Sequence, residues 1–186
     1  GSHGVGMNLQ SFLRLRDSQA VALCDVDKPR MVNANNLVKR IYGKSFKGCF
    51  LTGDWREVIA RDDIDAVMIS TPDHWHAPMA IAAARAGKDV ECEKPTISIE
   101  EGRVIANTVK RYGTVFQLST EDRSIGVYHR MAELVRNGRI GKLHTIRVTL
   151  PGGPGRAGNP TPQPVPEGLD YDMWLGPAPW APYTFQ

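Results

Sequence analysis

The sequence predicts a doubly wound α/β fold, in which helices cover both faces of a parallel sheet. Segments with a helical pattern alternate with short apolar runs such as Ala20–Cys24 and Ala66–Ser70, as expected for strands joined by helical crossovers. Both runs are continuously apolar, which indicates strands buried on two faces. Polar residues follow several runs directly, and ligands of such sheets bind beyond the carboxyl ends of the strands.

The predicted strands and helices alternate along the chain. Pro29 stands near the start of a predicted helix, and Gly43 and Gly87 follow helix ends. Ser98 and Glu101 have the spacing of a capping box. The predicted strands are Ala20–Cys24, Cys49–Leu51, Ala66–Ser70, Asp89–Cys92 and Val115–Leu118. The predicted helices are Met7–Leu15, Lys28–Tyr42, a helix that Asp54 caps and that runs through Ala60, His74–Ala86, and Ser98–Tyr112.

A second, α+β domain is predicted to begin after this sheet. It starts with a helix over Val127–Arg136, and Leu143–Leu150 then alternates apolar and polar residues like a half-exposed antiparallel strand. Nine of the 13 prolines fall in the last 36 residues, which indicates a connector followed by an aromatic docking segment. Trp174 and Trp180 are expected to pin this segment to the body, or else to stack on substrate. The predicted domains are 1–122, 123–150 and 151–186.

Composition excludes several classes of function. A net charge of +3 is too small to indicate nucleic acid or an anionic membrane as a partner, and no apolar run approaches the ~20 residues that cross a bilayer. The three cysteines lack the spacing of a disulfide framework or a zinc site, so we expect three buried thiols. His74 and His76, two residues apart, would face different sides of a helix, so no metal site is predicted.

A glycine cluster and an acidic residue indicate a dinucleotide site. Gly4 and Gly6 stand at the start of a helix, where backbone amides can meet a pyrophosphate. Asp25 follows 19 residues after Gly6, at the end of the next strand, where a carboxylate can bind the ribose hydroxyls. A carboxylate there favours NAD over NADP, although Lys28 and Arg30 leave NADP open.

Three segments carry a family resemblance. Thr71–Pro95 (TPDHWHAPMAIAAARAGKDVECEKP) contains TP-x-x-x-H, AGK-x-V and EKP in succession. This run resembles the glucose-fructose oxidoreductase, inositol dehydrogenase and rhizopine-catabolism family (Gfo/Idh/MocA). Arg123–Lys142 and Leu169–Pro179 resemble the same family. The resemblance implies an N-terminal Rossmann domain that binds a nicotinamide dinucleotide, and a second domain whose open sheet forms the substrate site and a homo-oligomer contact.

The resemblance also implies roles for individual residues. Lys94 is expected to be catalytic, because a lysine beside the nicotinamide can donate to the reacting oxygen of an alcohol or ketone. The Lys94–Pro95 bond is a candidate cis peptide that would aim this side chain. Arg123 is expected either to touch cofactor or substrate or to make a structural ion pair. The residues expected along the cofactor are Gly4, Gly6, Asp25, Thr71, Pro72, His76, Glu93, Lys94 and Arg123.

The predicted function is an NAD-dependent oxidoreductase that moves hydride between the nicotinamide and a ring hydroxyl of a sugar, cyclitol or related polyol. Two alternatives remain: a glycosidase that uses NAD for oxidation and elimination, and a non-catalytic nucleotide-binding scaffold. The expected cofactor is NAD and the expected substrate a small carbohydrate-like molecule.

We also expect the chain to be a fragment. The first strand of the Rossmann sheet has no residues here, and the family's catalytic Asp and His would fall beyond Gln186. Gly1–His3 is identical to a common tag remnant, which leaves its origin open. Such a fragment is expected to be inactive and poorly stable alone. A cytoplasmic location is expected, with export left open.

Overall fold

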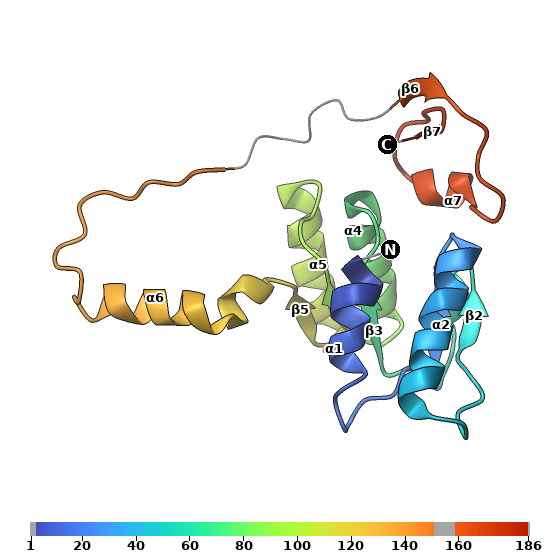
Figure 1. Cartoon of the computed structure of the whole chain (residues 1–186), viewed down its shortest axis with the longest axis horizontal. Coiled ribbons are helices and arrows are strands. Elements are labelled where there is room, and N and C mark those ends of the chain that lie inside the picture. Colours follow the sequence, from blue (N-terminus) through green and yellow to red (C-terminus); the bar gives the residue numbers. More distant parts are fainter. Residues whose placement is uncertain (1–2, 151–158, 186) are drawn as a thin grey trace. The chain divides into compact units, whose positions relative to one another are not determined.

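The computed structural model describes residues 3–150 and 159–185. The chain divides into two compact units, and Figure 1 labels most of their helices and strands. One unit comprises Gly1–Ser119 with Pro164–Tyr183, and the other comprises Thr120–Gln163 with Thr184–Gln186.

The first unit contains two parallel sheets. β1 pairs with β2, with Ala22 opposite Phe50, and β3, β4 and β5 form the second sheet in that order. Each strand lies within two residues of its predicted position, because a continuously apolar run followed by polar residues marks a buried strand well. The strands are β1 (Ala22–Cys24), β2 (Phe50–Thr52), β3 (Ala66–Ile69), β4 (Asp89–Cys92) and β5 (Phe116–Leu118).

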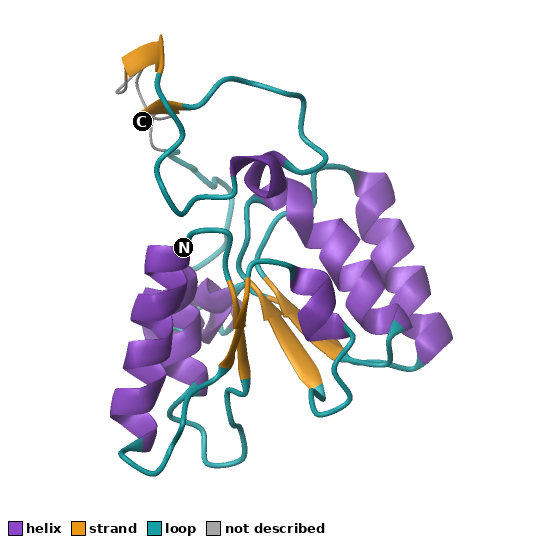
Figure 2. Cartoon of the chain, turned by 90° about the vertical axis from the view of Figure 1, so that its right-hand side faces the viewer, coloured by secondary structure: helices purple, strands orange, loops and turns teal. Residues whose placement is uncertain are grey.

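Helices lie on both sides of these strands (Figure 2), which confirms the predicted α/β class. The capping box of Ser98 and Glu101 is present, and Asp54 accepts a hydrogen bond at its helix start. Gly43 and Gly87 have φ values of 85° and 77°, which favour glycine and end their helices. The helices are η1 (Gly4–Leu9), α1 (Gln10–Phe12), α2 (Lys28–Tyr42), α3 (Trp55–Ile59), α4 (Asp73–Arg85) and α5 (Ile99–Tyr112).

No ladder joins β1 to β3 in the described part of the chain, so the predicted single sheet is divided in two. Side chains bridge the two sheets instead. Leu23 of β1 and Met68 of β3 both pack against one hydrophobic cluster beneath the first helices. Its buried members are Leu9, Leu13, Ala34 and Val38. The packing of η1, α2 and Leu13, which directly follows α1, therefore holds the two sheets in one unit.

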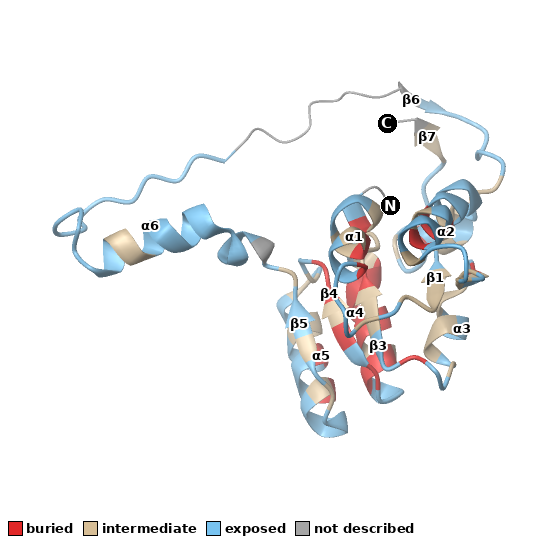
Figure 3. Cartoon of the chain, turned by 60° about the horizontal axis from the view of Figure 1, so that its bottom comes forward, coloured by how far each residue is buried: buried red, intermediate tan, exposed pale blue. Residues whose placement is uncertain are grey.

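A second cluster fills the space between the three-stranded sheet and α4 and α5. Figure 3 shows buried residues concentrated in α4 and along β4. Ala80 and Ala83 are fully buried where α4 meets its neighbours, and small side chains let helix and sheet approach closely. The buried members are Ile69, Trp75, Ala77, Met79, Ala80, Ala83, Val90, Cys92 and Ile105. This core fixes the carboxyl ends of β3 and β4, where ligands of such sheets bind.

The second unit contains η2 (Glu121–Ser124), α6 (Gly126–Arg136), β6 (Asn159–Pro162) and β7 (Thr184–Phe185). β6 and β7 pair antiparallel, although β6 was expected to be part of a connector. The predicted strand Leu143–Leu150 is wrong, because these residues are exposed and form no strand. An alternating pattern produces a strand only when a neighbour pairs with its backbone, and no described segment does so here.

The prediction of three buried thiols is confirmed for Cys92 only. Cys49 is half-buried and Cys24 is exposed. Among the described residues β1 pairs with β2 alone, which leaves the other edge of this strand open. Burial, together with the charges of Glu91 and Glu93, raises the pKa of Cys92 to about 12, so this thiol stays protonated.

Candidate functional site

The site is built around Glu93, which directly follows β4. Its side chain is buried, with 7% of the residue exposed, and its backbone N–H donates to the Ile69 carbonyl at 2.9 Å. Asn8 Nδ2 donates to Glu93 Oε1 at 2.8 Å and lies 2.9 Å from Ser70 Oγ. His3 Nε2 lies 2.9 Å from the same carboxylate oxygen. The first helix is thereby joined to the ends of β3 and β4.

These contacts keep Glu93 ionised. Burial by itself raises the pKa of the Glu93 carboxyl, but the hydrogen bonds from Asn8 and His3 and from the Lys94 backbone lower it by more. The pKa of Glu93 therefore lies below its ordinary value. Asn8 was missed in the sequence. Its position four residues after Gly4, on the same helical face, is the one signal that points to it.

Gly4 brings the first helix close to the end of β3. A Cβ at Gly4 would lie 2.8 Å from Ser70 Cβ, so a larger residue would force the two elements apart. Gly6 is exposed, and a Cβ there would meet nothing within 4 Å. The backbone of Gly6 is therefore open to a ligand, whereas Gly4 is needed for packing. Both glycines lie inside the helical turn of η1.

His76 connects two turns at this edge. It is 1% exposed, with Nδ1 at 2.7 Å from the Pro95 carbonyl oxygen and Nε2 at 3.0 Å from the Thr71 carbonyl oxygen. Since both ring nitrogens face carbonyl oxygens, His76 positions the turns after β3 and β4, and its direct contact with a cofactor stays a prediction. Pro72 is the N-cap of α4.

Thr71 supplies an unsatisfied polar group at the end of β3. Its Oγ1 is buried and has no hydrogen-bond partner among the described residues. A buried hydroxyl without a partner is costly and uncommon. This arrangement fits a bound molecule that would complete the hydrogen bond.

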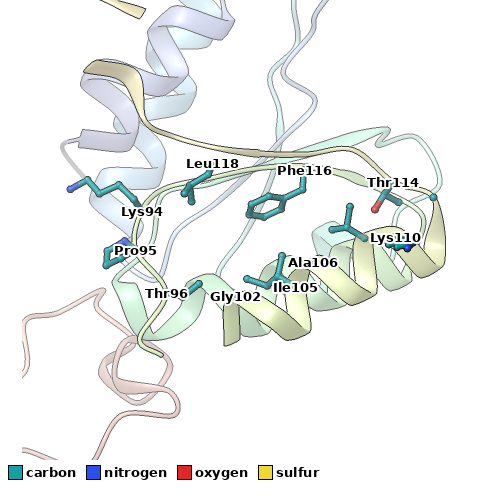
Figure 4. A pocket seen from close by; sticks show the side chains of 12 residues that line it. Lys94, Pro95, Thr96, Gly102, Ile105, Ala106, Lys110, Thr114, Phe116 and Leu118 are labelled. Atoms are coloured by element: carbon teal, nitrogen blue, oxygen red, sulfur yellow. The ribbon is translucent and has the colours of Figure 1, made fainter. Parts of the chain in front are cut away.

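Lys94 is exposed, and the Lys94–Pro95 bond is cis, as predicted. An open groove of about 780 Å³ begins at this turn and runs between α5 and β5. The Lys94 side chain extends away from α5, while Ile105, Ala106 and Phe116 line the groove (Figure 4). The mostly apolar walls of this groove offer few hydrogen-bond partners to a dinucleotide.

A distant segment covers the turn after β1. We call residues 164–183 the strap; it contains α7 (Tyr171–Leu175). Leu169 makes an antiparallel bridge with Asp27. The Asp170 N–H donates to the Val26 carbonyl at 2.9 Å, and the Lys28 N–H donates to the Gly168 carbonyl at 3.0 Å. The strap thereby reaches the neighbourhood of Asp25, the predicted ribose ligand.

Aromatic residues attach the strap to α4. Trp75 Nε1 donates to the Met173 carbonyl at 2.9 Å, and a nitrogen of His74 lies 2.9 Å from the Trp174 carbonyl oxygen. The Trp174 ring also lies edge-on against the His74 ring of α4, with centroids 6.1 Å apart, which supports its predicted docking role. Trp180 is 78% exposed, so its predicted docking is wrong. The sequence alone does not show which of the two tryptophans packs against α4.

Arg123 lies in η2, in the second unit, where its backbone N–H donates to the Thr120 carbonyl. Its predicted part in the site stays a prediction. Within the described ranges, no cluster of three or more metal-ligating side chains occurs. None of the described helices is long and apolar enough to span a membrane.

Comparison with known proteins decides the family. The model of the Gfo/Idh/MocA oxidoreductase family, NAD-binding Rossmann fold, matches residues 4–120. The chain belongs to the Gfo/Idh/MocA oxidoreductase family. The family's C-terminal alpha/beta domain matches residues 155–186. The resemblance seen in the Thr71–Pro95 motifs is thus confirmed.

Two curated relatives match more than half of this chain. Levoglucosan dehydrogenase of Pseudarthrobacter phenanthrenivorans is 37% identical over 99 residues, which are 53% of this chain and 25% of that protein. Alpha-N-acetylgalactosaminidase of Shewanella oneidensis is 37% identical over 120 residues, which are 60% of this chain and 26% of that protein.

Solved structures share the fold. The crystal structure of myo-inositol 2-dehydrogenase from Lactobacillus plantarum matches with a TM-score of 0.65 at 27% identity, over 76% of this chain and 41% of that chain. The chain therefore spans less than half the length of each of these three proteins.

Proposed function

We propose that the protein containing this chain is an NAD-dependent oxidoreductase that transfers hydride between the nicotinamide and a ring hydroxyl of a sugar, cyclitol or related polyol. The observation that carries the proposal is the position of Lys94 directly after the buried, ionised Glu93, at the carboxyl end of β4. Family membership and the dehydrogenases among its relatives support it.

The residues at the strand ends fit a dinucleotide. The exposed backbone of Gly6 at the start of the first helix suits a pyrophosphate, and Asp25 suits the hydroxyls of the adenosine ribose. The unpaired Thr71 Oγ1 offers a hydrogen-bonding group on the path toward Glu93 and Lys94. The cofactor would thus run from the turn after β1 to the turn after β4.

In the proposed mechanism, side chains of the protein handle the proton of the reacting hydroxyl group. When bound, the nicotinamide accepts or returns the hydride. The Lys94 Nζ would hold the reacting oxygen, donating to a carbonyl oxygen in one direction and orienting the hydroxyl in the other. Glu93 would keep a fixed negative charge beside this lysine, held by Asn8. We assign a further acid or base to the substrate domain.

Replacement of Lys94 tests this assignment. We expect Lys94→Met to lower kcat by a factor of about 10² to 10⁴ while the Kd for NAD changes little, since the lysine acts on the reacting oxygen. Steady-state kinetics and calorimetry measure the two quantities. Lys110→Met is the matched control, because Lys110 is an exposed lysine at the far end of the same groove. Equal turnover in both variants would refute the role of Lys94.

A glycoside-cleaving activity is the second candidate. The similarity to alpha-N-acetylgalactosaminidase over 60% of this chain favours it. In such a reaction NAD would oxidise the sugar transiently, permit elimination, and be regenerated. Release of the aglycone without accumulation of NADH would select this candidate, whereas stoichiometric NADH would select the dehydrogenase.

We also propose a homo-oligomer formed through the sheet of the substrate domain, and a cytoplasmic location. Light scattering of the full-length protein tests the first. Fractionation of the source cells tests the second.

A further inference from the structure

The turn after β1 bears on which dinucleotide the proposed site accepts. An NADP site needs donors for the 2′-phosphate near the ribose, commonly an arginine close to the strand end. Lys28 and Arg30 follow β1 and supply two cations. These cations can bind a 2′-phosphate only if other groups of the protein do not already hold them.

Asp27 holds Arg30 through both carboxylate oxygens. Arg30 Nε donates to Asp27 Oδ2 at 3.0 Å, and the Arg30 backbone N–H donates to Asp27 Oδ1 at 3.0 Å. The second contact also caps α2. The guanidinium is therefore paired with a carboxylate, and a 2′-phosphate would have to displace Asp27 or lie beside its negative charge.

The backbone donors of this turn are also occupied. The Asp27 N–H donates to Asp25 Oδ1 at 3.0 Å. The Lys28 N–H donates to the Gly168 carbonyl of the strap, 140 positions away in the sequence, at 3.0 Å. Gly168 has φ +86°, and a Cβ there would lie 3.3 Å from Pro29 Cδ. Glycine thus allows the strap carbonyl to approach the turn closely.

We propose that Asp27 and the strap residue Gly168 select NAD by closing this turn to a 2′-phosphate. Asp27 holds the Arg30 guanidinium and adds a second negative charge near Asp25. Gly168 occupies the Lys28 backbone N–H, whereas the exposed Lys28 side chain is not part of this closure. The inference rests on the proposed function, because it concerns which dinucleotide that same site accepts.

The test compares the Kd values of NAD and NADP in the full-length protein. Asp27→Asn keeps a side-chain oxygen for the Arg30 N–H and removes the charge that holds the guanidinium. We expect the Kd for NADP to fall about tenfold relative to that for NAD, the scale of one charge-assisted hydrogen bond. Asp27→Ser also retains a cap and is the second variant. Retained NAD binding shows that each variant is folded.

A double variant and a strap variant show which residues cause the change in NADP affinity. In Asp27→Asn with Arg30→Ala, the gain in NADP affinity should disappear, because Arg30 would supply it. Gly168→Ala should strain the strap and expose the Lys28 N–H, with a smaller gain of about threefold. An unchanged NADP affinity in Gly168→Ala would refute the role of the strap.

The outcomes separate this inference from the function on which it rests. If the unaltered protein binds neither dinucleotide, the proposed function fails. If it binds NAD but the affinity ratio is unchanged in both Asp27 variants, only the selection mechanism fails. Three further results would overturn the selection mechanism. The first is a gain in NADP affinity that persists when Arg30→Ala is added to Asp27→Asn. The others are equal affinity of the unaltered protein for NAD and NADP, and loss of NAD binding in both Asp27 variants.

Discussion

The turns that follow β1 and β4 are held in different ways. After β1, backbone groups of Val26 and Lys28 are bound by the strap, and Asp27 is paired with Arg30. After β4, one buried carboxylate, Glu93, is held by the Asn8 side chain, and the next residue, Lys94, is exposed. In the first turn, backbone and side-chain groups are already hydrogen-bonded, an arrangement that suits discrimination between NAD and NADP. The second combines a fixed charge with an exposed lysine side chain, an arrangement that suits proton transfer.

Removing the anchor of the strap should have the largest effect on stability. Trp75 is 8% exposed, belongs to the core beneath α4, and donates to the Met173 carbonyl. Trp75→Ala should lower the free energy of unfolding by about 3–5 kcal/mol, because a large cavity forms and the strap loses its partner.

Urea unfolding measures this loss, with Trp180→Ala as the control. Trp180 is 78% exposed, so its removal should change the free energy of unfolding by about 0.5 kcal/mol or less. A similar loss in both variants would show that the strap is not anchored through Trp75.

A change at Gly4 should disturb the other turn by an intermediate amount. Gly4→Ala would place a Cβ 2.8 Å from Ser70 Cβ, and such overpacking costs about 1–3 kcal/mol. The first helix would shift away from the ends of β3 and β4. Gly6→Ala, where a Cβ meets nothing within 4 Å, should leave stability unchanged or raise it by up to about 1 kcal/mol. Equal stability of the two variants, measured by thermal unfolding, would contradict this packing role.

The smallest effect should come from Asn8. Asn8→Ala removes one donor from the buried Glu93 carboxylate and should cost about 1–2 kcal/mol near neutral pH. Because the pKa of Glu93 is lowered on folding, its stabilisation is present above the unfolded pKa of about 4.3 and disappears as the pH falls through the lower folded pKa.

Unfolding measured between neutral and acidic pH checks the sign. The stability of the unaltered protein should fall with acid more steeply than that of Glu93→Gln, which cannot titrate at this position. Parallel curves for the two proteins would show that Glu93 does not gain its charge stabilisation on folding.

Local patterns predicted much of the fold. The capping box of Ser98 and Glu101 and the apolar run Ala66–Ser70 are determined by neighbouring residues, and both occur as expected. Leu143–Leu150 has an equally clear pattern but forms no strand, because pairing depends on a partner elsewhere in the chain. An alternating pattern shows that a segment can form a strand, but the strand forms only where a neighbouring strand pairs with its backbone.

The parts of the site that were missed are non-local. Asn8 and Glu93 lie 85 positions apart, and Lys28 meets Gly168 across 140. Motifs identified Glu93 and Lys94, whereas only the helical spacing from Gly4 pointed to Asn8, which holds the carboxylate. The sequence likewise left Arg30 as an available cation, whereas its pairing with Asp27 follows only from side-chain geometry.

Titration of the full-length protein with NAD and then with NADP tests the central claim most directly. Asp25, the paired Arg30 and the strap-covered turn predict that NAD binds and that its Kd is lower than that of NADP by about tenfold or more. Absence of heat and of any thermal stabilisation with both dinucleotides would contradict the claim that these strand ends form a nicotinamide cofactor site.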